Sequence, residues 1–377
     1  MTSLLVVAGE ASGDRAAAGV VSLLSGVSAF GLGGAALANH GVELVEDLRS
    51  LTALGIGEAG ARMWPIARAF RSVVRAARSF RPRAALLVNY TEFNARLARR
   101  LHADGVRVLW YIAPQVWAWR PHRAATLGPR VDRMAVVLPF EERIWRAHGV
   151  DASYVGHPVF EAEALDRANA RQAISMTPYA SAVALMPGSR PHEVRRLLVP
   201  MLEAYERVRS ERASVDARVL VAPSLDARTH DWLKAICTAR RVPTFDVDPS
   251  LGAIRVLRAF DASLCASGTA SLEAALARAT PVIAYRVGLA TELAARLFVR
   301  TAHLALPNVL LGRRVFAELI QRDARPGPIA AALEDALDRR TFFAAACSEV
   351  DASFGPERRP SAAVAAILEP WLALPGA

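Results

Sequence analysis

Cysteine is scarce in this sequence, and no residue spacing typical of a metal site is present. The three cysteines among 377 residues, Cys237, Cys265 and Cys347, are odd in number and lie far apart. That arrangement excludes a disulfide framework and the paired spacing of a zinc ribbon. We therefore predict no structural metal and no cofactor.

Lysine is scarcer still, because Lys234 is the only lysine among 46 basic residues. A phosphate-binding loop ending in Gly-Lys is therefore excluded, and a lysine Schiff base would have to use that one residue. The net charge of +10 favours an anionic partner: nucleic acid, a membrane surface or a phosphorylated substrate. The sequence has no RNP, KH or zinc-finger pattern, so we predict no nucleic-acid partner.

Long hydrophobic runs are also missing, although 53% of the residues are hydrophobic. No segment approaches the roughly 18 unbroken apolar residues that a membrane-spanning helix needs. The amino terminus has no basic region, and Glu10 and Asp14 interrupt its first apolar run, which argues against a secretory signal. These absences predict a cytoplasmic protein.

Short aliphatic runs alternate with longer helical patterns along the chain. This alternation is typical of βαβ units, so we predict an α/β protein with two Rossmann-like parallel-sheet domains facing a central cleft. The rhythm breaks around Gly156-His157-Pro158, which divides a first domain at 1–165 from a second at 166–345. From Gly312 onward the pattern is helical. The segment 346–377 forms a separate helical region, and one possibility is that it packs back on the first domain. The predicted strands are 4–8, 27–31, 42–45, 84–89, 106–112, 134–138 and 153–155, then 183–186, 218–221, 244–247, 262–266 and 281–284.

Two glycine-containing turns in the second half of the chain are typical of phosphate sites. Each follows an apolar run and opens a helical pattern, so backbone N–H groups and the helix dipole would face an anion. The first turn is Gly188-Ser189-Arg190 and the second is Ser267-Gly268-Thr269. Glu273 lies one helical turn further on, where its carboxylate could accept hydrogen bonds from sugar hydroxyls. Two such turns predict a diphosphate ligand.

Two strand-end loops of the first half carry further candidates. The loop after the first predicted strand places Glu10 and Ser12 at the mouth of the predicted cleft, and an ordinary helix start explains it equally well. The loop 113–120 places Gln115 and Trp117 directly after a buried strand. Core packing explains a tryptophan there, but specificity residues collect at strand-end loops. We therefore favour a functional loop.

The segment 59–91 contains seven arginines and no acidic residue. Four of these arginines fall at helical spacing beside an apolar stripe, a pattern that suits an anionic membrane interface. A helix that packs on the first sheet and leaves solvated arginines outside explains the pattern equally well. The candidate membrane residues are Trp64, Arg68, Phe70, Arg71, Arg75 and Arg78.

Six motifs together resemble the lipid-A-disaccharide synthase family, whose members are glycosyltransferases with two Rossmann-like domains in the arrangement called GT-B. They occur in family order over nearly the whole chain, which makes the set specific although each motif alone is weak. The motifs are Ala8-Gly9-Glu10-Ala11-Ser12-Gly13-Asp14, Pro114-Gln115-Val116-Trp117-Ala118-Trp119-Arg120, Gly156-His157-Pro158, Pro187-Gly188-Ser189-Arg190-Pro191-His192-Glu193-Val194, Ala266-Ser267-Gly268-Thr269-Ala270-Ser271-Leu272-Glu273 and Leu306-Pro307-Asn308-Val309-Leu310-Leu311-Gly312-Arg313.

The resemblance implies an inverting transferase of lipid A biosynthesis, peripheral on the inner membrane. Its donor would be UDP-2,3-diacylglucosamine and its acceptor 2,3-diacylglucosamine 1-phosphate (lipid X). Arg190 would stabilise the departing diphosphate by paired hydrogen bonds, and Ser12, Gln115 and Trp117 would contact the acceptor. The oligomeric state, a homodimer among the options, is left open. The implied donor residues are Gly188, Ser189, Arg190, Glu193, Ser267, Gly268, Thr269, Glu273 and Asn308.

One position departs from the family pattern. The family's loop after the corresponding strand typically reads Ile-Asp-Ala-Pro-Asp-Phe-Asn, and its first aspartate is a favoured candidate for the catalytic base. Here Asn89 occupies that position, and an amide cannot act as a base. Glu92, at the second aspartate's position, could serve instead unless it only caps the next helix, and Glu10 is the other candidate. Two alternatives follow: a related UDP-sugar glycosyltransferase with a different acceptor, or an inactive homologue that binds the UDP-sugar or lipid.

Overall fold

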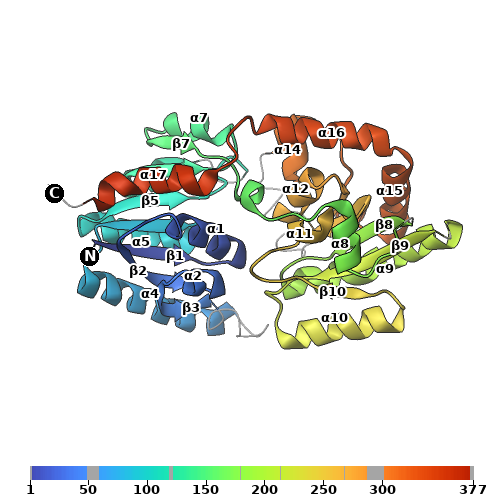
Figure 1. Cartoon of the computed structure of the whole chain (residues 1–377), viewed down its shortest axis with the longest axis horizontal. Coiled ribbons are helices and arrows are strands. Elements are labelled where there is room, and N and C mark those ends of the chain that lie inside the picture. The colour runs from blue at the N-terminus through green and yellow to red at the C-terminus, as the bar shows by residue number, and fades with distance from the viewer. Residues whose placement is uncertain are drawn as a thin grey trace. The chain divides into compact units, whose positions relative to one another are not determined.

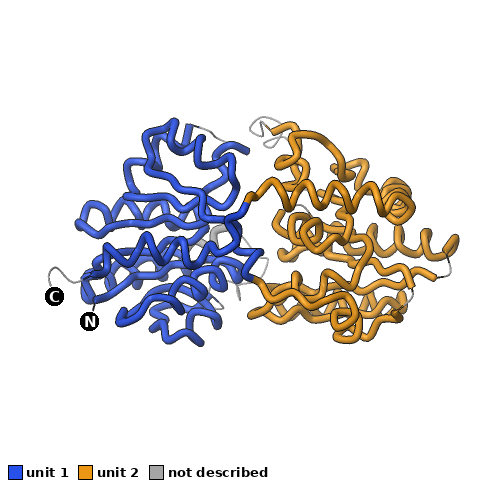
Figure 2. The backbone as a smooth tube through the Cα atoms, turned by 45° about the horizontal axis from the view of Figure 1, so that its top comes forward, with its two compact units in different colours: residues 1–161, 356–377 blue, residues 162–355 orange. Residues whose placement is uncertain are grey.

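The structure is a computed structural model that describes residues 2–48, 59–118, 122–178, 180–212, 214–266, 268–286 and 301–373. The chain divides into two compact units, which Figure 2 shows in two colours. Unit 1 comprises Met1–Glu161 and Pro356–Ala377, and unit 2 comprises Ala162–Gly355. Each unit contains one parallel sheet with helices around it (Figure 1), which confirms the predicted α/β class.

The sheet of unit 1 has the strand order β3-β2-β1-β4-β5-β6-β7, and its neighbouring strands are parallel. β1 and β4 pair at its centre, where Val6 lies opposite Leu86. Every residue of β4 is buried, because helices cover both faces of such a sheet and its strands read as continuous apolar runs. The strands are β1 (Thr2–Ala8), β2 (Val27–Gly33), β3 (Glu43–Asp47), β4 (Ala84–Val88), β5 (Arg107–Tyr111), β6 (Arg133–Val136) and β7 (Ala152–Tyr154).

The sheet of unit 2 repeats this topology in the order β10-β9-β8-β11-β12-β13, again with parallel neighbours. The helical pattern predicted from Gly312 onward holds from Pro326, but a short strand precedes it. That strand, β13, pairs with β12 at Ile283 and Glu318, and three residues are too few to show an alternating pattern. The strands are β8 (Ser181–Met186), β9 (Val215–Val221), β10 (Thr244–Asp246), β11 (Ala262–Ala266), β12 (Thr280–Tyr285) and β13 (Glu318–Ile320).

Helices connect the strands of each sheet. The α-helices of unit 1 are α1 (Ala11–Val21), α2 (Ala35–Asn39), α4 (Ala59–Phe80), α5 (Thr91–Ala103), α6 (Arg123–Leu127), α7 (Glu141–Arg146) and α17 (Pro360–Leu372). Those of unit 2 are α8 (Arg167–Ala173), α9 (Pro191–Glu211), α10 (Ala227–Ala239), α11 (Ile254–Leu257), α12 (Thr269–Leu276), α14 (Leu306–Leu311), α15 (Pro326–Asp338) and α16 (Arg340–Ser353).

The last helix, α17, belongs to unit 1 although α16 just before it belongs to unit 2. It packs against α1 and lies near β1, β4 and β5 (Figure 1). Glu161 fixes its first turn by accepting a hydrogen bond of 2.9 Å from the Ser361 N–H. At its other end, Arg83 donates to the Ala373 carbonyl at 2.6 Å. The carboxyl-terminal segment therefore completes the first unit.

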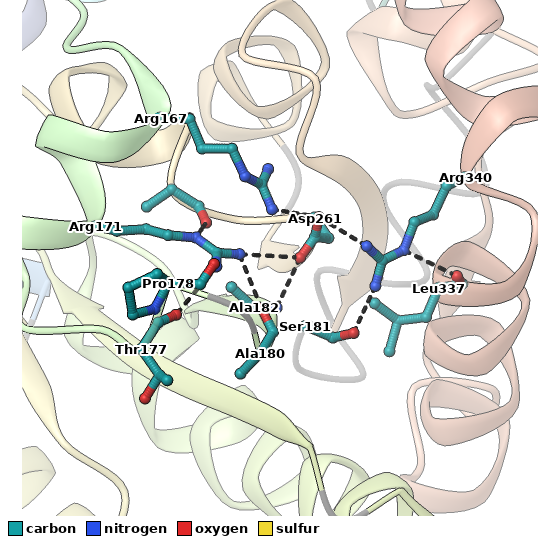
Figure 3. Close-up of polar contacts among 11 residues, drawn as sticks. Arg167, Arg171, Thr177, Pro178, Ala180, Ser181, Ala182, Asp261, Leu337 and Arg340 are labelled. Atoms are coloured by element: carbon teal, nitrogen blue, oxygen red, sulfur yellow. Dashed lines mark hydrogen bonds and ion pairs between the residues drawn. The ribbon is translucent and has the colours of Figure 1, made fainter.

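A buried carboxylate, Asp261, ties two helices of unit 2 to the amino ends of β8 and β11 (Figure 3). It accepts from Arg167 at 2.7 Å, from Arg340 at 3.1 Å and from the Ala182 N–H at 2.8 Å. The guanidinium of Arg171, itself buried, lies 3.4 Å away and also donates to four backbone carbonyls. Removal of this one negative charge would leave three arginines close together without their shared partner.

We predict that Asp261→Asn lowers the free energy of unfolding by about 3–5 kcal/mol, because one partner of a buried ionic network is lost. Urea denaturation measures the change. The control is Asp338→Asn, which breaks an exposed pair with Arg212 at 2.5 Å and should cost less than about 1 kcal/mol. Equal effects of the two substitutions would contradict this account.

Candidate functional site

Each sheet has a point where the strand order reverses, between β1 and β4 in unit 1 and between β8 and β11 in unit 2. Loops that leave the carboxyl ends of such strands diverge and form the usual ligand site of an open α/β sheet. Glu10 and Asn89 follow β1 and β4, and the turns containing Gly188 and Gly268 follow β8 and β11. The topology thus places the main predicted site residues of each unit at its own reversal point.

The turn after β8 is held from beneath by Glu193. This side chain is 11% exposed and accepts from the N–H groups of Ser189 at 3.1 Å and Arg190 at 3.3 Å. Arg190 also donates to its other oxygen at 3.2 Å. Both oxygens of Glu193 thus bond to the turn itself, which makes Glu193 a support of the predicted donor site rather than a direct contact. The Arg190 side chain is 60% exposed and remains a candidate for anion binding.

Gly188 is required in this turn for two reasons. Its φ of +125° lies in the region that favours glycine. A Cβ at this position would meet the Glu193 side chain at 2.5 Å, which is closer than nonbonded atoms approach. The second turn contains Gly268 with a similar φ of +123°, but among the described residues no atom beyond the two chain neighbours lies within 4 Å of a Cβ built there.

The turn after β11 starts helix α12 at Thr269, which is exposed. The Ser271 hydroxyl donates to the Gly268 carbonyl at 2.8 Å, which fixes the first turn of the helix. Glu273 is half-buried, one turn along α12. Ser267, also predicted to bind the donor, lies outside the described residues.

Asn308 is bonded to the segment that leads into β13. Its amide is fully buried; it donates to the Phe316 carbonyl at 2.9 Å and to Glu318 at 2.8 Å. Its oxygen accepts from the N–H groups of Val315 and Phe316. All four hydrogen-bonding positions of the amide are therefore occupied, so its side chain acts as a support within the predicted donor site.

In unit 1, Asn89 lies beside Glu10. The Asn89 amide donates a long hydrogen bond of 3.4 Å to the exposed Glu10 carboxylate. Asn89 and Tyr90 both have positive φ values, 51° and 43°, so the chain turns sharply as it leaves β4. The buried Asn94 amide stabilises this turn by donating to the Asn89 carbonyl at 2.9 Å. A strained backbone held by its surroundings is common at functional sites.

Tyr90 was not among the predicted site residues, yet its ring covers Gly9, where a Cβ would lie 2.1 Å from it. Burial, and secondarily the negative charge of Glu10, raise the pKa of Tyr90. Tyr285, at the end of β12, was also missed. Burial raises its pKa first, Glu193 adds to this and Arg190 opposes it. Their positions directly after predicted strands were the available signal.

Glu92 lies in the first turn of α5 and is ion-paired. Its carboxylate is 66% exposed and contacts the Arg123 guanidinium at 2.6 Å. The helix start and the cation both stabilise the negative charge. Glu92 is therefore partnered by Arg123 of helix α6.

The loop after β5 contains the predicted acceptor residues Gln115 and Trp117. Gln115 is exposed, but the Trp117 indole N–H donates to buried Glu141 at 2.9 Å. Burial raises the pKa of Glu141 to about 7, although its hydrogen bonds oppose this. Ser12, the third predicted acceptor residue, is exposed in the first turn of α1.

Helix α4 presents an arginine-rich face. Trp64 is 66% exposed, and the arginines at 68, 71, 75 and 78 are all exposed. Phe70, by contrast, packs edge-on against Phe93 at 5.4 Å between ring centres, so its assignment to the membrane face is not supported. Within the described part of the chain, no helix is both long enough and apolar enough to cross a membrane.

Comparisons with known proteins agree with this architecture. Residues 4–352 match the family described as Lipid-A-disaccharide synthetase. A lipid-A-disaccharide synthase from Anaeromyxobacter sp. (strain K) is 41% identical, covering 95% of this chain and 94% of the relative. Among solved structures, a UDP-GlcNAc 2-epimerase from Neisseria meningitidis bound to UDP-GlcNAc has a TM-score of 0.66 at 9% identity, covering 98% and 100%. A glycosyltransferase from Rickettsia africae ESF-5 has a TM-score of 0.56 at 10% identity, covering 99% of each chain.

The crowding at Gly188 generates a prediction about stability. Gly188→Ala should cost more than Gly268→Ala by about 1–3 kcal/mol, because both changes strain the backbone but only the first forces a Cβ into Glu193. Urea denaturation of the two variants measures the difference. Equal costs would show that Glu193 moves aside without penalty.

Proposed function

Because the chain belongs to the lipid-A-disaccharide synthase family, we propose that the turns at its strand-order reversals are the donor and catalytic elements of that activity. The protein is a glycosyltransferase of lipid A biosynthesis with a GT-B fold. The observation that carries the site assignment is the position of these turns, each directly after a central strand. The detailed roles below are inferred from the contacts of each residue.

Unit 2 binds the UDP-sugar donor in this proposal. The start of α12 offers backbone N–H groups at a helix N-terminus, which bind phosphates well, whereas the Ser189 and Arg190 N–H groups are already bonded to Glu193. Arg190 supplies a charged donor for the diphosphate as negative charge develops on it. Glu273 accepts from the sugar hydroxyls. Glu193 acts indirectly, since it fixes the turn from below.

Unit 1 supplies the base, and its contacts favour Glu10 over Glu92. Glu10 lies two residues after the central strand β1, at the strand-order reversal, and receives the amide N–H of Asn89. Glu10 takes the proton from the attacking acceptor hydroxyl as the new bond to the anomeric carbon forms. The bond from that carbon to the diphosphate breaks on the opposite face, and UDP leaves with the electron pair. The anomeric configuration is inverted.

The acceptor in this proposal is lipid X, and the donor sugar carries two acyl chains. Both are amphiphiles, so the enzyme would work at a membrane surface. The exposed arginines of α4 and the exposed Trp64 suit contact with anionic headgroups. We place the protein on the cytoplasmic face of the inner membrane on this basis.

The activity is tested with purified protein, UDP-2,3-diacylglucosamine and lipid X, with UDP and disaccharide measured together. We expect the two products in equal amounts. UDP release without disaccharide would indicate a different acceptor. Donor binding without UDP release, even with excess lipid X, would indicate a binding protein and overturn the proposal.

The choice of base is tested by two matched substitutions. Glu10→Gln should lower kcat by about 100- to 10,000-fold, because the acceptor hydroxyl loses its proton acceptor. Glu92→Gln, the control on the neighbouring loop, should leave kcat near its wild-type value. The reverse pattern would assign the base to Glu92.

Asn89→Asp should shift the acid limb of the pH–rate profile to higher pH. The new carboxylate would repel the negative charge of Glu10 and so raise the pKa of the proposed base.

The membrane surface is tested with a variant in which Arg68, Arg71, Arg75 and Arg78 are all serine. Each arginine near an anionic surface contributes about 1 kcal/mol, so binding to phosphatidylglycerol vesicles should fall about 100-fold or more. The control replaces four exposed arginines of α9: Arg195, Arg196, Arg207 and Arg209. Vesicle sedimentation measures the binding of both variants. An equal loss of binding in the control would show that net charge alone, and not the α4 surface, controls binding.

A further inference from the structure

The loop after β5 is fixed where it begins. Ile112 has a φ of +60°, which is a real outlier for a β-branched residue. Its N–H donates to the Ala135 carbonyl of β6 at 3.1 Å. Such a conformation persists only when the surrounding structure imposes it. The path of the loop out of the sheet is therefore determined at its first residue.

The same loop is fixed a second time at Trp117. The indole N–H donates to Glu141 at 2.9 Å, and the ring packs edge-on against Phe140 at 5.0 Å between ring centres. The other oxygen of Glu141 accepts from the Leu138 N–H at 3.1 Å. One buried carboxylate thus bonds both the loop after β5 and the loop after β6.

This arrangement gives Trp117 and Glu141 roles that exclude direct polar contact with a substrate. Trp117 has one polar group, the indole N–H, and that group bonds Glu141. Glu141 is 1% exposed and acts only through its neighbours. Gln115 lies between the two fixed points, Ile112 and Trp117, with its side chain exposed. Burying the Glu141 carboxylate costs free energy, and the hydrogen bonds that it accepts from two loops offset this cost.

We propose that Glu141 is a positioning residue for the acceptor: through Trp117 it holds the loop 113–118 so that Gln115 presents its amide to the acceptor's polar groups. The inference rests on the proposed function, since it assumes that this loop meets the acceptor. Glu141 itself touches no reacting atom. Its removal therefore affects acceptor binding and leaves donor binding in unit 2 unchanged.

The test compares Glu141→Gln, Trp117→Phe and the double variant. Trp117→Phe keeps an aromatic ring against Phe140 and removes the indole N–H. The two loops donate to different oxygens of Glu141, and glutamine replaces one of these oxygens by an NH2 donor, so one of the two hydrogen bonds is lost. Each single change should raise the KM for lipid X about tenfold, the loss expected for one charge-assisted hydrogen bond. The KM for the UDP-sugar should stay unchanged.

The double variant separates positioning from general damage. If Glu141 acts through Trp117, the double variant should have the same lipid X KM as either single variant, because both remove one interaction. The proposal would be overturned if the rise in the lipid X KM of the double variant were the product of the two single rises. An equal rise in the KM for both substrates would also overturn it. Glu142→Gln is the control, because Glu142 pairs with Arg146 at 2.6 Å on the same helix.

Two outcomes are thereby kept apart. A wild-type protein that forms no disaccharide contradicts the proposed function. An active wild type whose lipid X KM is unchanged in Trp117→Phe contradicts only the positioning role. Thermal unfolding of each variant confirms that it is folded, and Trp117→Phe alone decides the question if Glu141→Gln does not fold.

Discussion

The reversal of strand order at the centre of each sheet is the constraint on which the rest of the site depends. All strands in a sheet are parallel, so their carboxyl ends share one edge and their loops diverge where the order reverses. Residues far apart in sequence meet there because neighbouring strands end at the same level, as Cys265 and Met186 do. The phosphate-type turns of unit 2 and the Glu10–Asn89 pair of unit 1 occupy equivalent positions for this reason.

Buried carboxylates hold the loops at these edges. Glu193, Glu141 and Asp14 are each less than 9% exposed, and each accepts from backbone N–H groups of a turn. A loop has no ladder of hydrogen bonds to fix it, so an acid beneath it supplies acceptors that water would otherwise supply. The chain thus uses acidic residues both as supports and as candidate reacting groups. Only burial and hydrogen-bond partners distinguish these two uses.

That distinction explains what could be predicted from sequence. Strands were predictable because buried parallel strands are unbroken apolar runs. The turns were predictable because glycine and small polar residues follow those apolar runs. The partner of a polar side chain was not predictable. Asn308 lies in a family motif but bonds Phe316 and Glu318, and Trp117 bonds Glu141, which is 24 positions away. Such pairings depend on the tertiary structure, and neither spacing nor periodicity indicates them.

The substitution at Asn89 is best understood through its neighbour. Two carboxylates at the separation of Asn89 and Glu10, 3.4 Å, would repel each other, and one of them would tend to retain a proton. An amide at position 89 removes that repulsion and offers an N–H to the remaining acid. The strained turn and the Asn94 brace keep the amide in place. The pair therefore keeps one carboxylate, Glu10, and gains an N–H donor that orients it, an arrangement that agrees with the role proposed for Glu10 as the base.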